Sequence, residues 1–92
     1  MPTLPDDSEW LARERRAIGD RIRVERIRQS RTQESVFLAA DMSRSAYQAV
    51  EAGTADARIT TLMKIAHVLG VHVTDLLRDR PFLTSSQHEL DG

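Results

Sequence analysis

The strongest constraint on the fold is the series of helix-start and helix-end signals in residues 32–70. Thr32 and Ser43 stand where helix N-caps are expected, each directly before a short run of apolar residues at helical spacing. Gly53 and Gly70 stand where such runs end, as left-handed glycines commonly do. Strand signals are almost absent. The pattern predicts helices over residues 33–40, 44–52 and 59–69.

A first helix is predicted upstream of this region. Its inward stripe at helical spacing is anchored by Ile18, Ile22 and Ile27, with Ala17 and Val24 flanking it. We expect it to end near Ser30. The acidic cluster at residues 6–9 is typical of a helix start, so we expect a helical extension toward the N-terminus, continuous or kinked near Gly19.

A short fifth helix is predicted over residues 75–79, with Thr74 as N-cap and Pro81 as the stop. It would bury Leu76 and Leu77. The chain is therefore predicted to be all-α, with five helices. We divide it into an N-terminal extension, a helical domain and a flexible C-terminal tail, at residues 1–16, 17–80 and 81–92.

Composition narrows the class of protein. Ninety-two residues predict a single domain, and the absence of cysteine excludes disulfides and thiolate metal sites. No apolar run approaches the roughly 20 residues of a membrane span, and the acidic N-terminus is not a signal peptide. We expect a cytoplasmic protein that is not attached to a membrane.

The net charge of −1 conceals a basic block. Residues 13–31 contain eight arginines and three acidic residues, a local charge of +5. Such a block can bind phosphates whatever the net charge of the chain, but it is equally typical of a solvated helix face with internal ion pairs.

The helix at 44–52 has two contrasting faces. With its neighbour at 33–40 it is predicted to be held by apolar residues: Val36, Ala40, Met42, Tyr47 and Val50. The other face presents Arg44, Ser45, Gln48 and Ala49. Arginine can bind guanine through two hydrogen bonds and glutamine can do so with adenine, which favours a base-reading helix.

Several segments, in order, carry a family resemblance: IGDRIRVERIRQS, TQE, MSRSAYQAVEAG, TLMKIAHVLGV and TDLL. From Ile18 to Leu77 the chain resembles the phage-repressor/Cro-like helix-turn-helix family of bacterial transcriptional regulators. The resemblance implies a repressor-like domain that binds double-stranded DNA through base-reading residues Arg44, Ser45, Gln48 and Ala49. It also implies phosphate contacts by Gln33 and Ser43, and a structural salt bridge between Arg26 and Glu51.

The chain departs from the family pattern at three places. Asp41 replaces the usual corner glycine, which it can do because aspartate tolerates left-handed geometry. Phe37 replaces a small residue, and we expect its ring to lie against the first or fourth helix. Many relatives place basic residues of loop 54–58 against phosphate, whereas this chain has only Arg58, from which the resemblance implies such a contact. Further phosphate contacts are therefore expected from arginines of the first helix: Arg21, Arg23, Arg28 and Arg31.

No other chemistry is indicated. His67 and His72 share no helix face and lack a third ligand, so we expect no metal, no cofactor and no enzymatic activity. The favoured interpretation is a homodimeric repressor, paired through the fifth helix with Leu77 and Phe82 or through Trp10 and Leu11. Two alternatives stay open. One is an antitoxin-like regulator that binds a protein through its tails, and the other is a protein-interaction module without DNA affinity.

Overall fold

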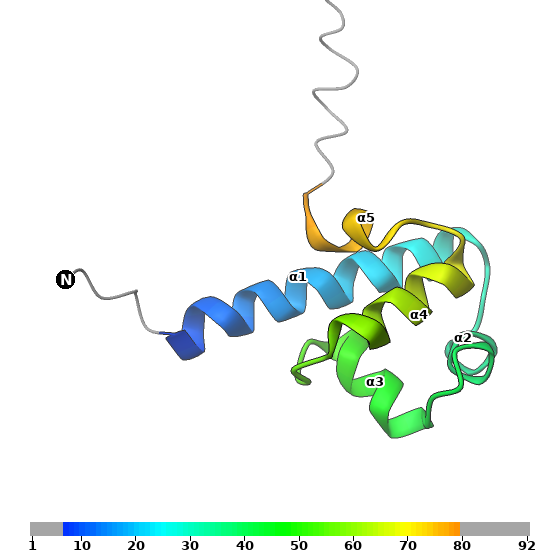
Figure 1. Ribbon diagram of the computed structural model, residues 1–92, viewed down its shortest axis with the longest axis horizontal. Coiled ribbons are helices and arrows are strands. Elements are labelled where there is room, and N and C mark those ends of the chain that lie inside the picture. Colours follow the sequence, from blue (N-terminus) through cyan, green and yellow to red (C-terminus); the bar gives the residue numbers. More distant parts are fainter. Residues whose placement is uncertain (1–6, 80–92) are drawn as a thin grey trace, which may run out of the picture.

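The computed structural model describes residues 7–79, which fold into five helices (Figure 1). They are α1 (Asp7–Arg28), α2 (Gln33–Ala39), α3 (Arg44–Ala52), α4 (Ile59–Leu69) and α5 (Val73–Leu77). No strand occurs between residues 7 and 79, which confirms the all-α prediction. The long α1 contacts α3, α4 and α5, and α2 packs on α3 and α4. The predicted tail 81–92, with its stop at Pro81, lies outside the described residues.

The predicted helix ends are confirmed where local chemistry fixes them. The Thr32 hydroxyl accepts a hydrogen bond from the Ser35 amide at 3.0 Å and caps α2. The Ser43 hydroxyl accepts one from the Ala46 amide at 3.1 Å and caps α3. Gly53 and Gly70 follow α3 and α4 with left-handed φ values of 79° and 72°. Each of these signals lies within a few residues of the bond it makes.

The inward stripe predicted for α1 is partly wrong. Ile22 is fully buried, but Val24 and Ile27 are 59% and 54% exposed. The buried line of α1 continues instead through polar residues, because this part of the helix passes the end of α4. There Gln29 Nε2 donates to the Leu69 carbonyl at 2.7 Å, and the carboxylate of Glu25, which is buried, accepts a second bond from that amide at 2.8 Å.

The start of α5 also differs from the prediction. The helix begins at Val73 rather than residue 75, and His72 occupies the N-cap position. The His72 amide donates to Asp75 Oδ2 at 3.1 Å, so Asp75 completes the cap from inside the helix. Leu76 is buried as expected, whereas Leu77 is 41% exposed.

A close crossing of α1 and α3 explains the glycine inside α1. The helix runs without a break through residue 19, and a Cβ at Gly19 would lie 2.3 Å from the Glu51 carbonyl oxygen. At Gly53 a Cβ would lie 2.6 Å from the Cα of Arg16. The two glycines therefore let the backbones of α1 and of the end of α3 come into contact. This close contact fixes the angle between the two helices.

The core joins all five helices. Its fully or almost fully buried large side chains are Ile22, Val36, Tyr47, Ile65 and Leu76. None of the helices formed by residues 7–79 has the length and apolar character needed to cross a membrane. Within the same range, no group of three or more His, Cys, Asp or Glu side chains is placed to hold a metal ion.

Candidate nucleic-acid interface

The corner between α2 and α3 is closed by backbone hydrogen bonds around a left-handed aspartate. Asp41 has φ of 59°, the geometry that the usual glycine would adopt. Its amide donates to the Leu38 carbonyl at 3.1 Å, and the Met42 amide donates to the Phe37 carbonyl at 2.8 Å. Val36, Ala40, Tyr47 and Val50 are buried between the helices, and Met42 is partly buried, as predicted.

The Phe37 ring makes its aromatic contacts with α3, a neighbour that the sequence analysis did not name. Its centroid lies 6.2 Å from that of Tyr47, with the planes tilted by 44°. The guanidinium carbon of Arg44 lies 5.2 Å from the centroid of the same ring. Phe37 is only 5% exposed, so the ring forms part of the wall between α2 and α3.

The predicted base-reading residues share one outward face at the start and middle of α3. Arg44, Ser45 and Gln48 are exposed and Ala49 is partly buried. Among residues 7–79, the side chains of Arg44 and Ser45 have no hydrogen-bond or ion-pair partner. An exposed row of this kind at a helix N-terminus offers donors and acceptors to base edges.

Behind this face, Glu51 is the centre of a buried polar cluster. Arg26 binds its carboxylate in a fork, with Nε to Oε2 at 2.8 Å and Nη2 to Oε1 at 3.0 Å. Tyr47 donates its hydroxyl to Oε2 at 2.5 Å, and Gln33 Nε2 donates to Oε1 at 2.8 Å. The Arg26–Glu51 pair implied by the resemblance is therefore present, with the Glu51 side chain only 4% exposed.

The ionisation of the cluster follows from these contacts. Burial alone would raise the pKa of Glu51, but hydrogen bonds from Arg26, Tyr47 and Gln33 outweigh it, and the pKa is lowered. The hydrogen bond to Glu51 raises the pKa of Arg26. Burial, together with that carboxylate, raises the pKa of Tyr47. The cluster is thus a stable carboxylate held by one cation and neutral donors.

Gln33 connects the buried cluster to the reading face. While its amide nitrogen bonds Glu51, its Oε1 accepts a hydrogen bond from Gln48 Nε2 at 3.2 Å. The two glutamines line a hollow of about 500 Å³ between α1 and α3, with Arg16 and Arg23 on its α1 side. The hollow therefore combines amide groups from α2 and α3 with cations from α1.

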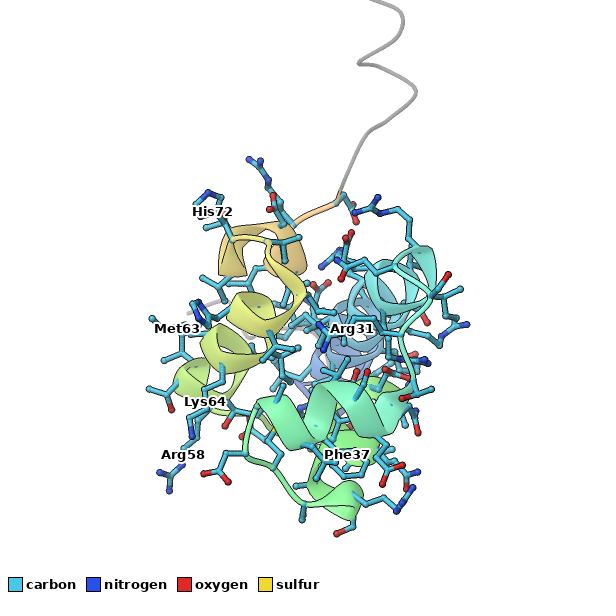
Figure 2. The ribbon with its side chains drawn as sticks, turned by 90° about the vertical axis from the view of Figure 1, so that its right-hand side faces the viewer. Arg31, Phe37, Arg58, Met63, Lys64 and His72 are labelled. Carbon is cyan, nitrogen blue, oxygen red and sulfur yellow. The ribbon has the colours of Figure 1, made fainter. Side chains whose placement is uncertain are left out.

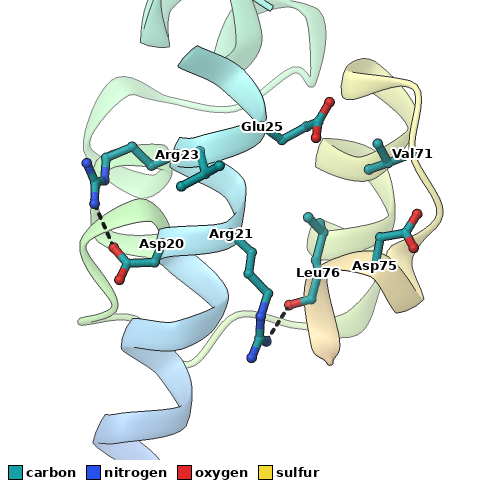
Figure 3. A pocket seen from close by; sticks show the side chains of 8 residues that line it. Asp20, Arg21, Arg23, Glu25, Val71, Asp75 and Leu76 are labelled. Atoms are coloured by element: carbon teal, nitrogen blue, oxygen red, sulfur yellow. Dashed lines mark hydrogen bonds and ion pairs between the residues drawn. The ribbon is translucent and has the colours of Figure 1, made fainter. Parts of the chain in front are cut away.

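Three further arginines of the basic block are used within the fold. Arg21 Nη1 donates to the Leu76 carbonyl at 3.0 Å (Figure 3). Its Nη2 pairs with Asp79 at 2.7 Å. Arg28 pairs with Glu25, and Arg31 Nη1 donates to the Val68 carbonyl at 2.8 Å. The block thus joins α1 to the C-terminal ends of α4 and α5, which leaves less free positive charge than the sequence indicates.

Arg58 lies at the N-cap position of α4. It is exposed and projects outward on the same side of the molecule as Lys64 (Figure 2). Ser43 is also exposed, with its hydroxyl accepting the capping bond. A hydroxyl that accepts one bond retains a proton with which to donate another.

Comparison with known proteins assigns the class of domain. Residues 22–76 match the Helix-turn-helix family model, which spans more than half of the chain. The chain belongs to this family, in its phage-repressor/Cro-like branch, and so carries the DNA-binding domain of a transcription regulator.

One solved structure shares the whole fold: "Crystal Structure of hypothetical transcription factor NHTF from Neisseria". It superposes with a TM-score of 0.72 over 95% of each chain, at 22% sequence identity. No curated protein matches the sequence.

Sequence reasoning missed Arg16 and the bond between Gln33 and Gln48. A signal for Arg16 was available, because residues 16 and 23 are seven apart and share a helix face with Asp20. The glutamine pair had no such signal, since its members lie on different helices and meet only when the corner is formed.

Proposed function

We propose that the protein is a sequence-specific transcriptional repressor that binds DNA as a homodimer and reads the major groove with α3. The observation that supports this most directly is the outward face of Arg44, Ser45 and Gln48 above a buried, fully bonded cluster. Exposed polar groups on a rigid support, with Gln48 braced by Gln33, match what base recognition needs. Occupancy of an operator would block transcription.

The proposed phosphate contacts follow from which groups remain available. Gln33, Ser43 and Arg58 keep the roles suggested by the resemblance. The guanidinium of Arg21 is bound to Leu76 and Asp79, with its side chain 16% exposed, so the proposal replaces it with cations of the hollow beside Gln33. These cations are Arg16 and Arg23, of which Arg23 is held only by an exposed pair with Asp20 at 2.9 Å.

The homodimer is proposed because one α3 offers few base contacts. A two-fold dimer doubles them on half-sites about 34–36 Å apart. Two surfaces have the exposed apolar side chains for pairing: Leu77 of α5 and Trp10 near the start of α1, which are 41% and 40% exposed. Phe82, the other candidate at the α5 surface, lies outside the described residues.

Selection of bound fragments from genomic and random duplexes, followed by titration at several salt concentrations, tests the proposal. A specific regulator shows one preferred sequence with two-fold symmetry and an affinity that falls steeply with salt. Absence of binding at low salt to both fragment pools would refute it. Analytical ultracentrifugation with and without the selected duplex tests the dimer independently.

Arg44→Ala is the sharpest substitution test of the reading face. We expect it to reduce discrimination at one base position by about 1–3 kcal/mol while other positions keep their preference. Arg23→Ala is the matched control, since loss of a phosphate contact weakens all sequences alike and lowers the salt slope. Equal weakening of all sequences by Arg44→Ala would show that Arg44 does not read a base.

A second candidate function is a protein-interaction module on the same scaffold. The observation that favours it is the internal use of α1 arginines, which reduces the positive charge available for phosphates. An antitoxin-like role through the tails rests on residues outside the described range. Salt-insensitive binding to a protein, with no duplex bound at low salt, would select this class.

A further inference from the structure

Phe37 and Arg44 form a cation–π pair at the junction of α2 and α3. The guanidinium carbon of Arg44 lies 5.2 Å from the centre of the Phe37 ring. This is within the roughly 6 Å at which a cation is attracted to an aromatic face. It is the contact that ties down the end of the Arg44 side chain, since residues 7–79 supply it with no hydrogen bond or ion pair.

The ring is a fixed support rather than a mobile one. Phe37 is 5% exposed and lies beside Tyr47, which is fully buried. The Tyr47 hydroxyl is in turn bonded to Glu51, and Glu51 to Arg26. A chain of contacts therefore runs from the buried ion pair through two aromatic rings to the first residue of α3.

The contact with the ring leaves the N–H donors of Arg44 without a hydrogen-bond partner among residues 7–79. Arginine carries five such donors, and bidentate binding of guanine uses two of them. A side chain held against a ring also loses less rotamer freedom when it binds, which favours affinity. The pair is thus arranged to support recognition without competing for the recognising atoms.

From this geometry we infer that Phe37 is a positioning residue for base recognition, which holds the Arg44 guanidinium toward a guanine in the major groove. The inference rests on the proposed DNA-reading function and adds a specificity determinant on α2, outside the recognition helix. It also gives a role to a bulky residue at a position where the family usually has a small one.

The test uses duplexes selected with the full-length protein. The base pair whose preference is lost in Arg44→Ala is identified first, and discrimination at that pair is then measured for Phe37→Leu. Leucine keeps the site apolar but has no aromatic face. We expect discrimination at that pair to fall roughly 2- to 5-fold, the range for a partly exposed cation–π contact. Phe37→Tyr, which keeps the face, should restore it.

Three controls separate positioning from a loss of structure. In an Arg44→Ala background, Phe37→Leu should leave base discrimination unchanged, because the group it positions is absent. Val50→Ala, a matched change at another buried position of the α2–α3 pair, should weaken all duplexes equally. Equal weakening of all duplexes by Phe37→Leu, or an undiminished effect without Arg44, would overturn the inference.

Nuclear magnetic resonance of the free protein tests the contact without DNA. Ring currents should shift the Arg44 side-chain protons upfield in the wild type and in Phe37→Tyr, and this shift should vanish in Phe37→Leu. If the shift is present but no duplex is preferred, the proposed function fails while the contact stands. If a sequence preference exists but the shift is absent, the positioning role fails while DNA reading stands.

Discussion

The two sides of α3 treat polar groups in opposite ways. On the inner side, Glu51 and Tyr47 are buried and every functional oxygen is hydrogen-bonded. On the outer side, Arg44 and Ser45 are exposed and have no bonded partner among residues 7–79. The difference shows how one nine-residue helix can be a structural element on one side and present unbonded polar groups on the other. The hydrogen bonds on the inner side fix the position of the helix. The unbonded polar groups on the outer side are available to a ligand.

Among these substitutions, Glu51→Ala should cause the largest loss of stability, because it removes the centre of the buried cluster on the inner side of α3. It leaves Arg26, which is 13% exposed, without its fork partner, and Tyr47 and Gln33 without their acceptor. Removing one side of a buried pair costs about 3–5 kcal/mol. Urea unfolding should show this loss in the free energy of unfolding. Glu34→Ala, an exposed change on α2, should alter it by less than about 0.5 kcal/mol.

Protonation of Glu51 should produce part of the same loss in the free energy of unfolding. Its hydrogen bonds lower its pKa in the folded protein below the ordinary value of 4.5. The unfolded chain therefore takes up the proton first as pH falls. The stabilisation should be complete above about pH 5 and decline below 4.5, toward the folded pKa. In Glu51→Gln this component is absent, so the stability gap to wild type should narrow with acid. A constant gap would contradict the pKa assignment.

Gly19→Ala tests the close crossing of α1 and α3, which holds the inner side of α3 against α1. Alanine favours a helix by about 1 kcal/mol, which would stabilise an exposed position. Here the added Cβ would meet the Glu51 and Val50 carbonyl oxygens at 2.3 and 2.7 Å, and backbone atoms cannot yield easily. We expect a net loss of about 1–3 kcal/mol in thermal or urea unfolding.

Asp20→Ala, at the next and exposed position of α1, is the matched control for that crossing. It gains helix propensity and loses only the exposed pair with Arg23, so its effect should be close to zero. A stabilising Gly19→Ala would show that α1 and α3 can separate without loss.

The structure on the inner side of α3 could be predicted from the sequence only where its signals lie close together in the chain. The caps at Thr32 and Ser43 and the glycines after α3 and α4 are each fixed within a few residues, and all were predicted. The Arg26–Glu51 pair came from family resemblance, because its partners are 25 residues apart. Periodicity alone placed Ile27 inside, with Val24 beside it, since it cannot tell which side of α1 meets a neighbour.

The outer side shows the reverse limit. The exposure of Arg44, Ser45 and Gln48 follows from which residues of α3 are apolar, so this exposed face was predictable. The use of basic-block arginines within the fold was not. Arg21 and Arg31 donate hydrogen bonds to carbonyl oxygens at the ends of α5 and α4. No sequence pattern predicts a backbone acceptor that lies more than 35 residues away in the chain. Charge counts therefore overestimate what a helical face can offer to phosphates.

The smallest predicted effect concerns the corner that joins the two sides. Asp41 and Ser30 both have left-handed φ, 59° and 56°, and glycine would adopt this geometry without strain. Glycine also makes the unfolded chain more flexible, which offsets part of the gain. Aspartate tolerates the left-handed region better than serine does. We therefore expect Ser30→Gly to stabilise by about 0.5–1 kcal/mol and Asp41→Gly by less, in urea unfolding. A larger gain at Asp41 would mean that the corner, rather than the end of α1, is the strained link beneath the reading face.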